Sequence, residues 1–149
     1  MSVESRARGM ILGILTAFVA VILAITFWPT PVDRPFDAQL MRILGTLHHA
    51  GVATWVDYSF VERLSNAIMF VPLGVLIALY FRRQLWWLSV ALPFVLSVCI
   101  ELGQGLFLPE RTASVSDVIA NTFGALIGGG AVAIIRFAVN AHRAPRPNA

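Results

Sequence analysis

The sequence predicts an all-α, polytopic membrane protein with four transmembrane helices and an outer amphipathic helix between the first two. Hydrophobic residues make up 58% of the 149 residues, and charged residues only 13%, about half the fraction usual in soluble domains. The mean hydropathy is +0.78. We expect a single membrane domain over residues 1–149, with its core at about 28–136 and a disordered tail at about 142–149.

Four apolar runs are long enough to cross a bilayer, since a helix needs about 20 residues to span roughly 30 Å of hydrocarbon. Only helices satisfy the backbone of such open-ended segments in lipid. The predicted spans are residues 10–28, 64–81, 85–107 and 118–137.

Between the first two spans lies the only sizeable extramembrane segment. It opens with WPTPVDRPF, whose prolines prevent the first helix from continuing. Apolar residues then recur at helical spacing at Phe36, Leu40, Ile43, Leu44 and Leu47. We expect an amphipathic helix there that rests on the outer membrane surface or caps the bundle.

The arginines predict the orientation of the chain. Seven of the eleven basic residues fall on the side of the two termini and of the loop between spans two and three, and four fall on the other side. The first group is Arg6, Arg8, Arg82, Arg83, Arg136, Arg143 and Arg146, and the second is Arg34, Arg42, Arg63 and Arg111. The positive-inside rule therefore predicts a multi-pass protein of the plasma (cytoplasmic) membrane with both termini in the cytoplasm.

Polar residues of three spans converge on the outer third of this topology. Asn66 lies in the first turn of span two, and Glu101 lies about 9 Å below the outer end of span three. Gln104 is one turn nearer the surface on the same face. Asp117 begins span four, and Asn121 lies one turn deeper. Charged groups in hydrocarbon usually mark function, so these residues are candidates for a ligand-binding site.

The turn before span four contributes two further candidates. Ser114 or Ser116 is a plausible N-cap, and Asp117 in the first turn suits the helix dipole. Arg111 is either a turn arginine at headgroup level or a member of the cluster, where it would pair with Glu101 or bind an anion.

Glu101 is the residue that most needs an explanation. A short acidic side chain at this depth must be neutral, paired with Arg111, or open to a polar cavity. The structural alternative is a hydrogen bond to Asn66, Asn121 or Arg111 that fixes helix packing. With Asp117, Glu101 would also form the candidate acid–base pair of an enzyme.

Small residues indicate close helix packing. Gly124 and Gly128 form a GxxxG pattern in span four, as do Gly9 and Gly13 in span one, and Gly74 lets a neighbour approach span two.

The remaining candidates for chemistry are weak. Cys99 is predicted to be a small core residue, and the adjacent His48 and His49 lack a third metal ligand. We expect no metal and no cofactor. The scattered arginines form no stripe, which argues against nucleic acid as a partner.

The chain resembles the VanZ-like membrane proteins. The segment SNAIMFVPLGVLI is similar to their N-x-x-x-F-x-P-x-G segment. Their remaining core pattern is matched by Glu101, Gln104, Arg111, Ser114, Asp117, Asn121, Gly124 and Gly128. The resemblance implies a link to low-level resistance against teicoplanin, a lipid-bearing glycopeptide, and implies no particular chemistry.

Three functions remain open at this point. The first is a non-enzymatic envelope protein that binds membrane lipids and a lipid-linked cell-wall precursor or lipoglycopeptide in an outward-facing polar pocket. The second is a membrane enzyme that modifies a lipid headgroup, with Glu101 and Asp117 as acid and base and Arg111 as anion clamp. The third is a structural or assembly protein that forms homo-oligomers through its GxxxG faces.

Overall fold

The computed structural model describes residues 3–28, 37–108 and 113–143, and all of its regular structure is helical. The elements are α1 (Val3–Thr26), α2 (Asp37–His49), α3 (Tyr58–Tyr80), the 3₁₀ turn η2 (Arg83–Leu85), α4 (Leu88–Phe107) and α5 (Val115–Arg143). Helices α1, α3, α4 and α5 are each long and apolar enough to cross a membrane. The predicted fold class is therefore confirmed.

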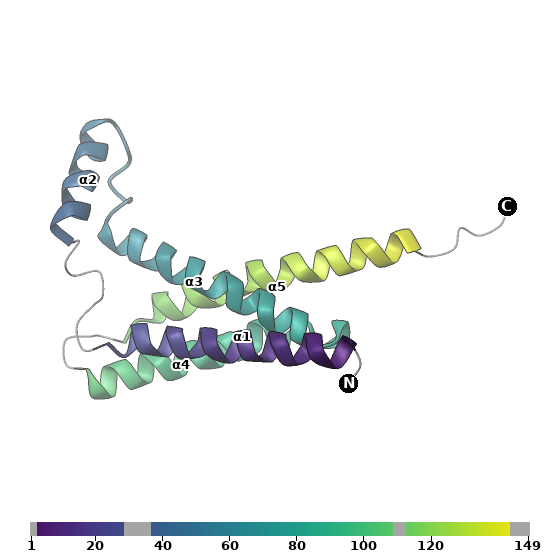
Figure 1. The fold of residues 1–149 in the computed structure, drawn as a ribbon. Coiled ribbons are helices and arrows are strands. Elements are labelled where there is room, and N and C mark those ends of the chain that lie inside the picture. The colour runs from purple at the N-terminus through teal and green to yellow at the C-terminus, as the bar shows by residue number, and fades with distance from the viewer. Residues whose placement is uncertain (1–2, 29–36, 109–112, 144–149) are drawn as a thin grey trace.

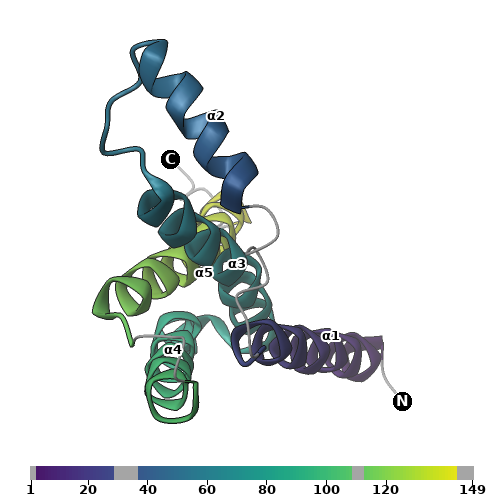
Figure 2. The same ribbon diagram turned by 90° about the vertical axis from the view of Figure 1, so that its left-hand side faces the viewer.

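Helices α3 and α5 cross at the centre of the molecule and share its most extensive contact (Figure 1). Helices α1 and α4 lie on one side of this pair, and α2 lies beyond the start of α3 (Figure 2). We call the end where α1 and α4 finish and α3 and α5 start the α2 end. The opposite end, where α1 starts and α5 finishes, is the termini end (Figure 1).

The buried core is small and takes at least one residue from each long helix. Its members are Ile22, Phe70, Leu73, Ile77, Ile100 and Ala125. Large apolar side chains such as Ile68, Phe94 and Ile134 stay exposed on the outer faces of the helices. That distribution suits a bundle whose surroundings are lipid, because exposed apolar groups cost nothing there.

Glycines allow α3 and α5 to touch backbone to backbone. A Cβ atom added to Gly124 or Gly128 would collide with the carbonyl groups of Ala67 and Val71 on α3. A Cβ atom on Gly74 would collide in the same way with the backbone of α5. We call this contact the glycine seam, and it fixes the crossing of the two central helices.

Two packing predictions are only partly met by the structure or differ from it. Gly9 and Gly13 on α1 have no atom within 4 Å of the place where a Cβ would stand, so their GxxxG pattern packs against none of the described residues, and packing between copies stays a prediction. Cys99 is exposed and is not a core residue. In lipid, a small apolar side chain is equally stable on the outside of the bundle, so composition alone did not place it.

Helix α2 forms where the amphipathic segment was predicted, but only part of its apolar stripe is buried. Leu44 is buried, whereas Ile43 and Leu47 on the same stripe remain largely exposed. The ring of His48 lies 3.1 Å from the carbonyl oxygen of Val56 through Nε2, which must donate in this contact. Phe36, the first residue of the stripe, lies outside the described residues.

Helix α5 extends beyond its predicted limits on both sides, to Val115 and Arg143. The tail predicted from residue 142 therefore begins within the helix, and residues 144–149 lie outside the described part of the chain.

Candidate functional site

The predicted site residues lie at the α2 end of the bundle and come from three helices and the segment before α5. Asn66 belongs to α3, Glu101 and Gln104 to α4, and Asp117 and Asn121 to α5, with Ser114 directly before it. Arg111 falls in residues 109–112, outside the described residues.

Helix α5 begins at a cap that two helices share. The backbone N–H of Asp117 donates to the Oγ atom of Ser114 at 3.4 Å, which makes Ser114 the N-cap; its hydroxyl also lies 2.7 Å from that of Ser116. In a capping box, the acid three residues after the cap would bind the N–H of the cap residue. Here the Ser114 N–H donates instead to Oε2 of Glu101, at 2.6 Å. An acid of α4 therefore completes the cap of α5.

This bond explains why Glu101 is tolerated with only 7% of its surface exposed. A carboxylate at a helix N-terminus is stabilised by the N–H group and by the helix dipole. This partner is a backbone group, which the sequence did not suggest, and the predicted pairing with Arg111 lies outside the described residues. Glu101 thus binds α4 to the start of α5.

Gln104 serves a different helix. It is 6% exposed, and its Nε2 atom donates to the carbonyl oxygen of Thr26 at 2.8 Å. Thr26 is the last residue of α1, where backbone carbonyls lack partners within the helix. Gln104 therefore holds the end of α1 against α4.

Asp117 connects α5 to α3. Its carboxylate accepts hydrogen bonds from the side chains of Asn66 and Ser114 and is attracted by the guanidinium of Arg63. Asn66, Asp117 and Arg63 are all only partly buried. We call Arg63, Asn66 and Asp117 the polar cluster.

Arg63 was not predicted as a site residue, because its position in the sequence indicated only a charge on the outer side. One signal was present, because Arg63 and Asn66 are three residues apart and so share a face of the helix.

Asn121 lies one turn below Asp117 on α5 and is 4% exposed. Its Nδ2 atom donates to the Oγ atom of Ser97 at 2.9 Å, whereas its Oδ1 atom is buried without a hydrogen-bond partner among the described residues. An unpaired buried acceptor costs about 1–3 kcal/mol, so it is retained only where something compensates. Ser97 was not foreseen as a partner.

The described residues contain no group of three or more His, Cys, Asp or Glu side chains placed to hold a metal ion. His48 and His49, the adjacent pair noted in the sequence, belong to no such group.

A comparison with known families decides the relationship of the chain. The family model described as VanZ/LLP1 matches residues 14–136. The chain belongs to the VanZ/LLP1 family. A curated VanZ relative, Protein VanZ of Enterococcus faecium, is 34% identical over 70 residues, which are 47% of this chain and 43% of the relative. The match thus covers less than half the length of that relative. No solved structure matches this chain.

The VanZ/LLP1 match includes every residue of the site, from Arg63 to Asn121. Within it, the polar side chains fall into two groups. Glu101 and Gln104 are buried and bonded to backbone groups at helix ends. The polar cluster has a carboxyl group, a guanidinium cation and an amide at the edge of the bundle, and the unpaired Oδ1 atom of Asn121 lies beneath it. The second group combines opposite charges with an unpaired acceptor, which makes it the better candidate for a ligand site.

Proposed function

We propose that this VanZ-family protein resides in the cytoplasmic membrane and binds the polar part of a lipidated or lipid-linked ligand at the polar cluster. In doing so it contributes to resistance against glycopeptides of the teicoplanin type. With both termini in the cytoplasm, as the arginines predict, the cluster faces the outer leaflet, where such ligands are found. The observation that carries the proposal is the pair of opposite charges, Asp117 and Arg63, partly buried between α3 and α5.

The chemistry of the cluster suits a ligand rich in hydroxyl and amide groups. The Asp117 carboxylate accepts hydrogen bonds, and the Arg63 guanidinium donates up to five. The Oδ1 atom of Asn121 lacks a donor, and a ligand N–H or O–H group that reached it would remove the cost of its burial. The surrounding apolar helix faces would accept an acyl chain. Arg111 stays a predicted anion contact, since it lies outside the described residues.

The test compares Asp117→Asn with Glu101→Gln in a susceptible bacterium that expresses the protein. We expect Asp117→Asn to leave the amount of protein in the membrane unchanged. It should weaken ligand binding about tenfold to a hundredfold, because a charge-assisted bond contributes about 1.5–3 kcal/mol. The measurements are the inhibitory concentration of teicoplanin and the protein level by immunoblot. Teicoplanin without its acyl chain serves as the comparison drug.

A matched control is Asp57→Asn at the same end of the bundle. Asp57 is exposed and caps α3 by accepting from the N–H of Phe60 at 2.8 Å, a role that asparagine can also fill. Resistance should therefore survive Asp57→Asn. Full resistance in Asp117→Asn, at a normal protein level, would contradict ligand binding at the polar cluster.

A second candidate function, a headgroup-modifying enzyme, is favoured by one contact. Ser114 bonds to both carboxylates, through its N–H to Glu101 and through its side chain to Asp117. Such an acid–base pair needs both acids, so Glu101→Gln and Asp117→Asn should each abolish turnover of a lipid-linked precursor by the purified protein. Unaltered precursor after incubation with the wild-type protein excludes this function and leaves binding.

A further inference from the structure

The termini end of the bundle contains an open cavity whose charged side chains are mostly basic. Its volume is about 300 Å³, and it lies between the start of α1, the end of α3 and the second half of α5. Arg8, Arg82, Arg83 and Arg136 line it together with a single acid, Glu4. The second half of α5 diverges from α1 and α3 at this end of the bundle (Figure 1).

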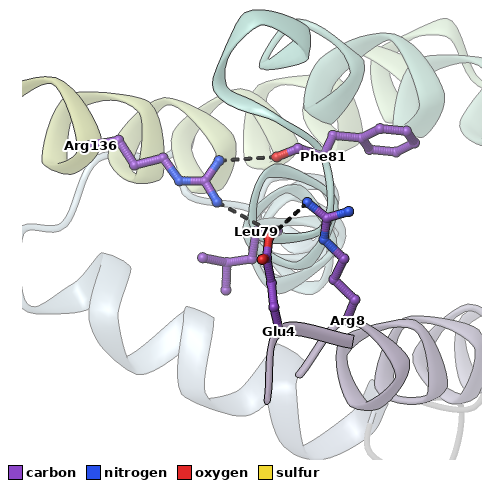
Figure 3. A network of polar contacts seen from close by, with 5 residues as sticks. All are labelled: Glu4, Arg8, Leu79, Phe81 and Arg136. Carbon is purple, nitrogen blue, oxygen red and sulfur yellow. Dashed lines mark hydrogen bonds and ion pairs between the residues drawn. The ribbon is translucent and has the colours of Figure 1, made fainter. Parts of the chain in front are cut away.

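Arg136 is held in place by the end of α3. Its Nη1 atom donates to the carbonyl oxygens of Ala78 at 2.7 Å and Phe81 at 3.2 Å, and its Nη2 atom donates to that of Leu79 at 3.2 Å. Figure 3 shows the bonds to Phe81 and Leu79. These bonds use three of the five guanidinium donors. The partial negative charge of the helix C-terminus offsets part of the charge of Arg136, so this residue chiefly shapes the cavity.

Arg82 and Arg83 supply the charge that is not compensated. Arg8 pairs with Glu4 at 3.4 Å on the surface of α1 (Figure 3). Within the described part of the chain, Arg82 and Arg83 are exposed, and their guanidinium groups form no hydrogen bond or ion pair. A cavity with four arginines against one carboxylate, two of the arginines unpaired, favours an anion.

A more apolar groove lies next to this cavity, and Arg83 lines both. Arg83 also lines a second cavity of about 320 Å³, whose other walls are Trp86 of the segment before α4 and Ala133, Ile134 and Phe137 of α5. The guanidinium of Arg83 lies 5.4 Å from the centroid of the Phe137 ring, in cation–π contact. Cationic and apolar surfaces that meet at one arginine match the phosphate and acyl chain of a phospholipid.

We propose that Arg82 and Arg83, with Arg136 behind them, form a binding site for an anionic phospholipid. The phosphate lies in the basic cavity, and one acyl chain lies in the groove of Trp86, Ile134 and Phe137. The site is at the opposite end of the bundle from the polar cluster and does not depend on the function proposed for that cluster. By the arginine distribution this end faces the cytoplasmic leaflet.

Trp86 provides the test, because it lines the groove that the acyl chain would fill. The full chain, with Trp28, Trp55 and Trp87 replaced by Phe, is reconstituted into vesicles. The quenching of its fluorescence by phosphatidylglycerol with brominated acyl chains is compared with quenching by brominated phosphatidylcholine. We expect the protein to bind phosphatidylglycerol about tenfold more tightly than phosphatidylcholine, and this preference should decrease as salt is added.

Substitutions assign the preference to the arginines. Arg83→Gln should lower the relative affinity about fivefold, and Arg82→Gln with Arg83→Gln should remove it. Both side chains are exposed and unpaired, so the fold should survive these changes. Arg42→Gln, which removes an equally exposed charge from α2, is the matched control and should change nothing.

Three results would overturn the assignment. Equal quenching by the two lipids in the unsubstituted single-tryptophan protein would exclude a selective site. An unchanged preference in the double variant would place the selectivity elsewhere. Finally, if millimolar inorganic phosphate relieved the quenching by brominated phosphatidylglycerol as effectively as unbrominated phosphatidylglycerol does, the ligand would be a soluble anion.

Discussion

At each end of this bundle, a side chain of one helix bonds to backbone groups at the terminus of another, with an acidic residue at one end and a basic residue at the other. At the α2 end, the N-terminus of α5 needs an acceptor, and Glu101 supplies a carboxylate from α4. At the termini end, the C-terminus of α3 needs donors, and Arg136 supplies a guanidinium from α5 (Figure 3). In both cases the polar side chain of one helix completes the backbone of another, where hydrocarbon would leave polar groups unpaired.

The comparison separates charges that hold the fold together from charges available to a ligand. Glu101 and Arg136 are engaged by the backbone. Close to each lies a second set that is not engaged in this way: Arg63 and Asp117 at one end, Arg82 and Arg83 at the other. A charge in a membrane helix is therefore not by itself a sign of function, and its hydrogen-bond partner decides the matter.

The glycine seam connects the two ends, so its loss should have the largest effect. Gly128→Ala puts a methyl group into the carbonyl of Val71, and a backbone group on a packed helix cannot move aside. We expect a loss of about 3 kcal/mol or more in the free energy of unfolding, measured in mixed micelles. Gly130→Ala is the control, because a Cβ at Gly130 meets nothing within 4 Å. Equal stability of the two variants would mean that the helices do not cross as described.

Removing the cap at the termini end should have the next largest effect. Arg136→Met keeps an apolar stem but leaves the carbonyls of Ala78, Leu79 and Phe81 without their donor. The expected loss is about 2–3 kcal/mol, because several acceptors become unsatisfied at once. Arg143→Met, at the end of α5, is the charge-matched comparison in the same unfolding experiment. If Arg136→Met proves no more harmful than Arg143→Met, this arginine does not cap α3.

The cap at the α2 end involves one N–H group, so its removal should cost less. Glu101→Ala should lower the free energy of unfolding by about 1–2 kcal/mol, because the Ser114 N–H loses its acceptor. Glu101→Gln keeps an acceptor and should lie between Glu101→Ala and the wild type. Amide hydrogen exchange at Ser114 checks the mechanism, and it should accelerate in Glu101→Ala. Unaltered exchange there would contradict the shared cap.

The smallest effect is expected inside the α2 end, below the polar cluster. The double change Asn121→Leu with Ser97→Ala removes a hydrogen bond together with an unpaired acceptor. Replacing both partners with apolar groups is close to neutral, so stability should change by less than about 0.5 kcal/mol. Ligand binding should nevertheless weaken. A large loss of stability would show that the Oδ1 atom of Asn121 has a partner of its own in the membrane.

Much of the fold could be read from the sequence, because bilayer thickness and hydropathy together determine where spans lie. The common depth of Asn66, Glu101 and Asp117 also followed from topology. Their partners did not, since hydrogen bonds depend on how helices cross. Glu101 bonds to a backbone N–H, a group that every residue except proline has and no sequence pattern marks.

Two identical patterns illustrate the same limit. Gly124 and Gly128 pack against α3, whereas Gly9 and Gly13 pack against no other described residue, although both pairs have the GxxxG pattern. Arg63 and Arg136 were likewise counted only as indicators of orientation. The atoms that their guanidinium groups reach are set by neighbouring helices rather than by their own segments.

The glycine seam has a consequence for how the protein is made. Helix α3 is synthesised and enters the membrane before α4, yet its central partner is α5. The backbone of α3 at Ala67 and Val71 therefore faces lipid, or a substitute helix, until residue 128 has been inserted. A chain interrupted in the loop after α4 contains three hydrophobic spans but no closed core, and it should be recognised by membrane quality-control proteases as incomplete.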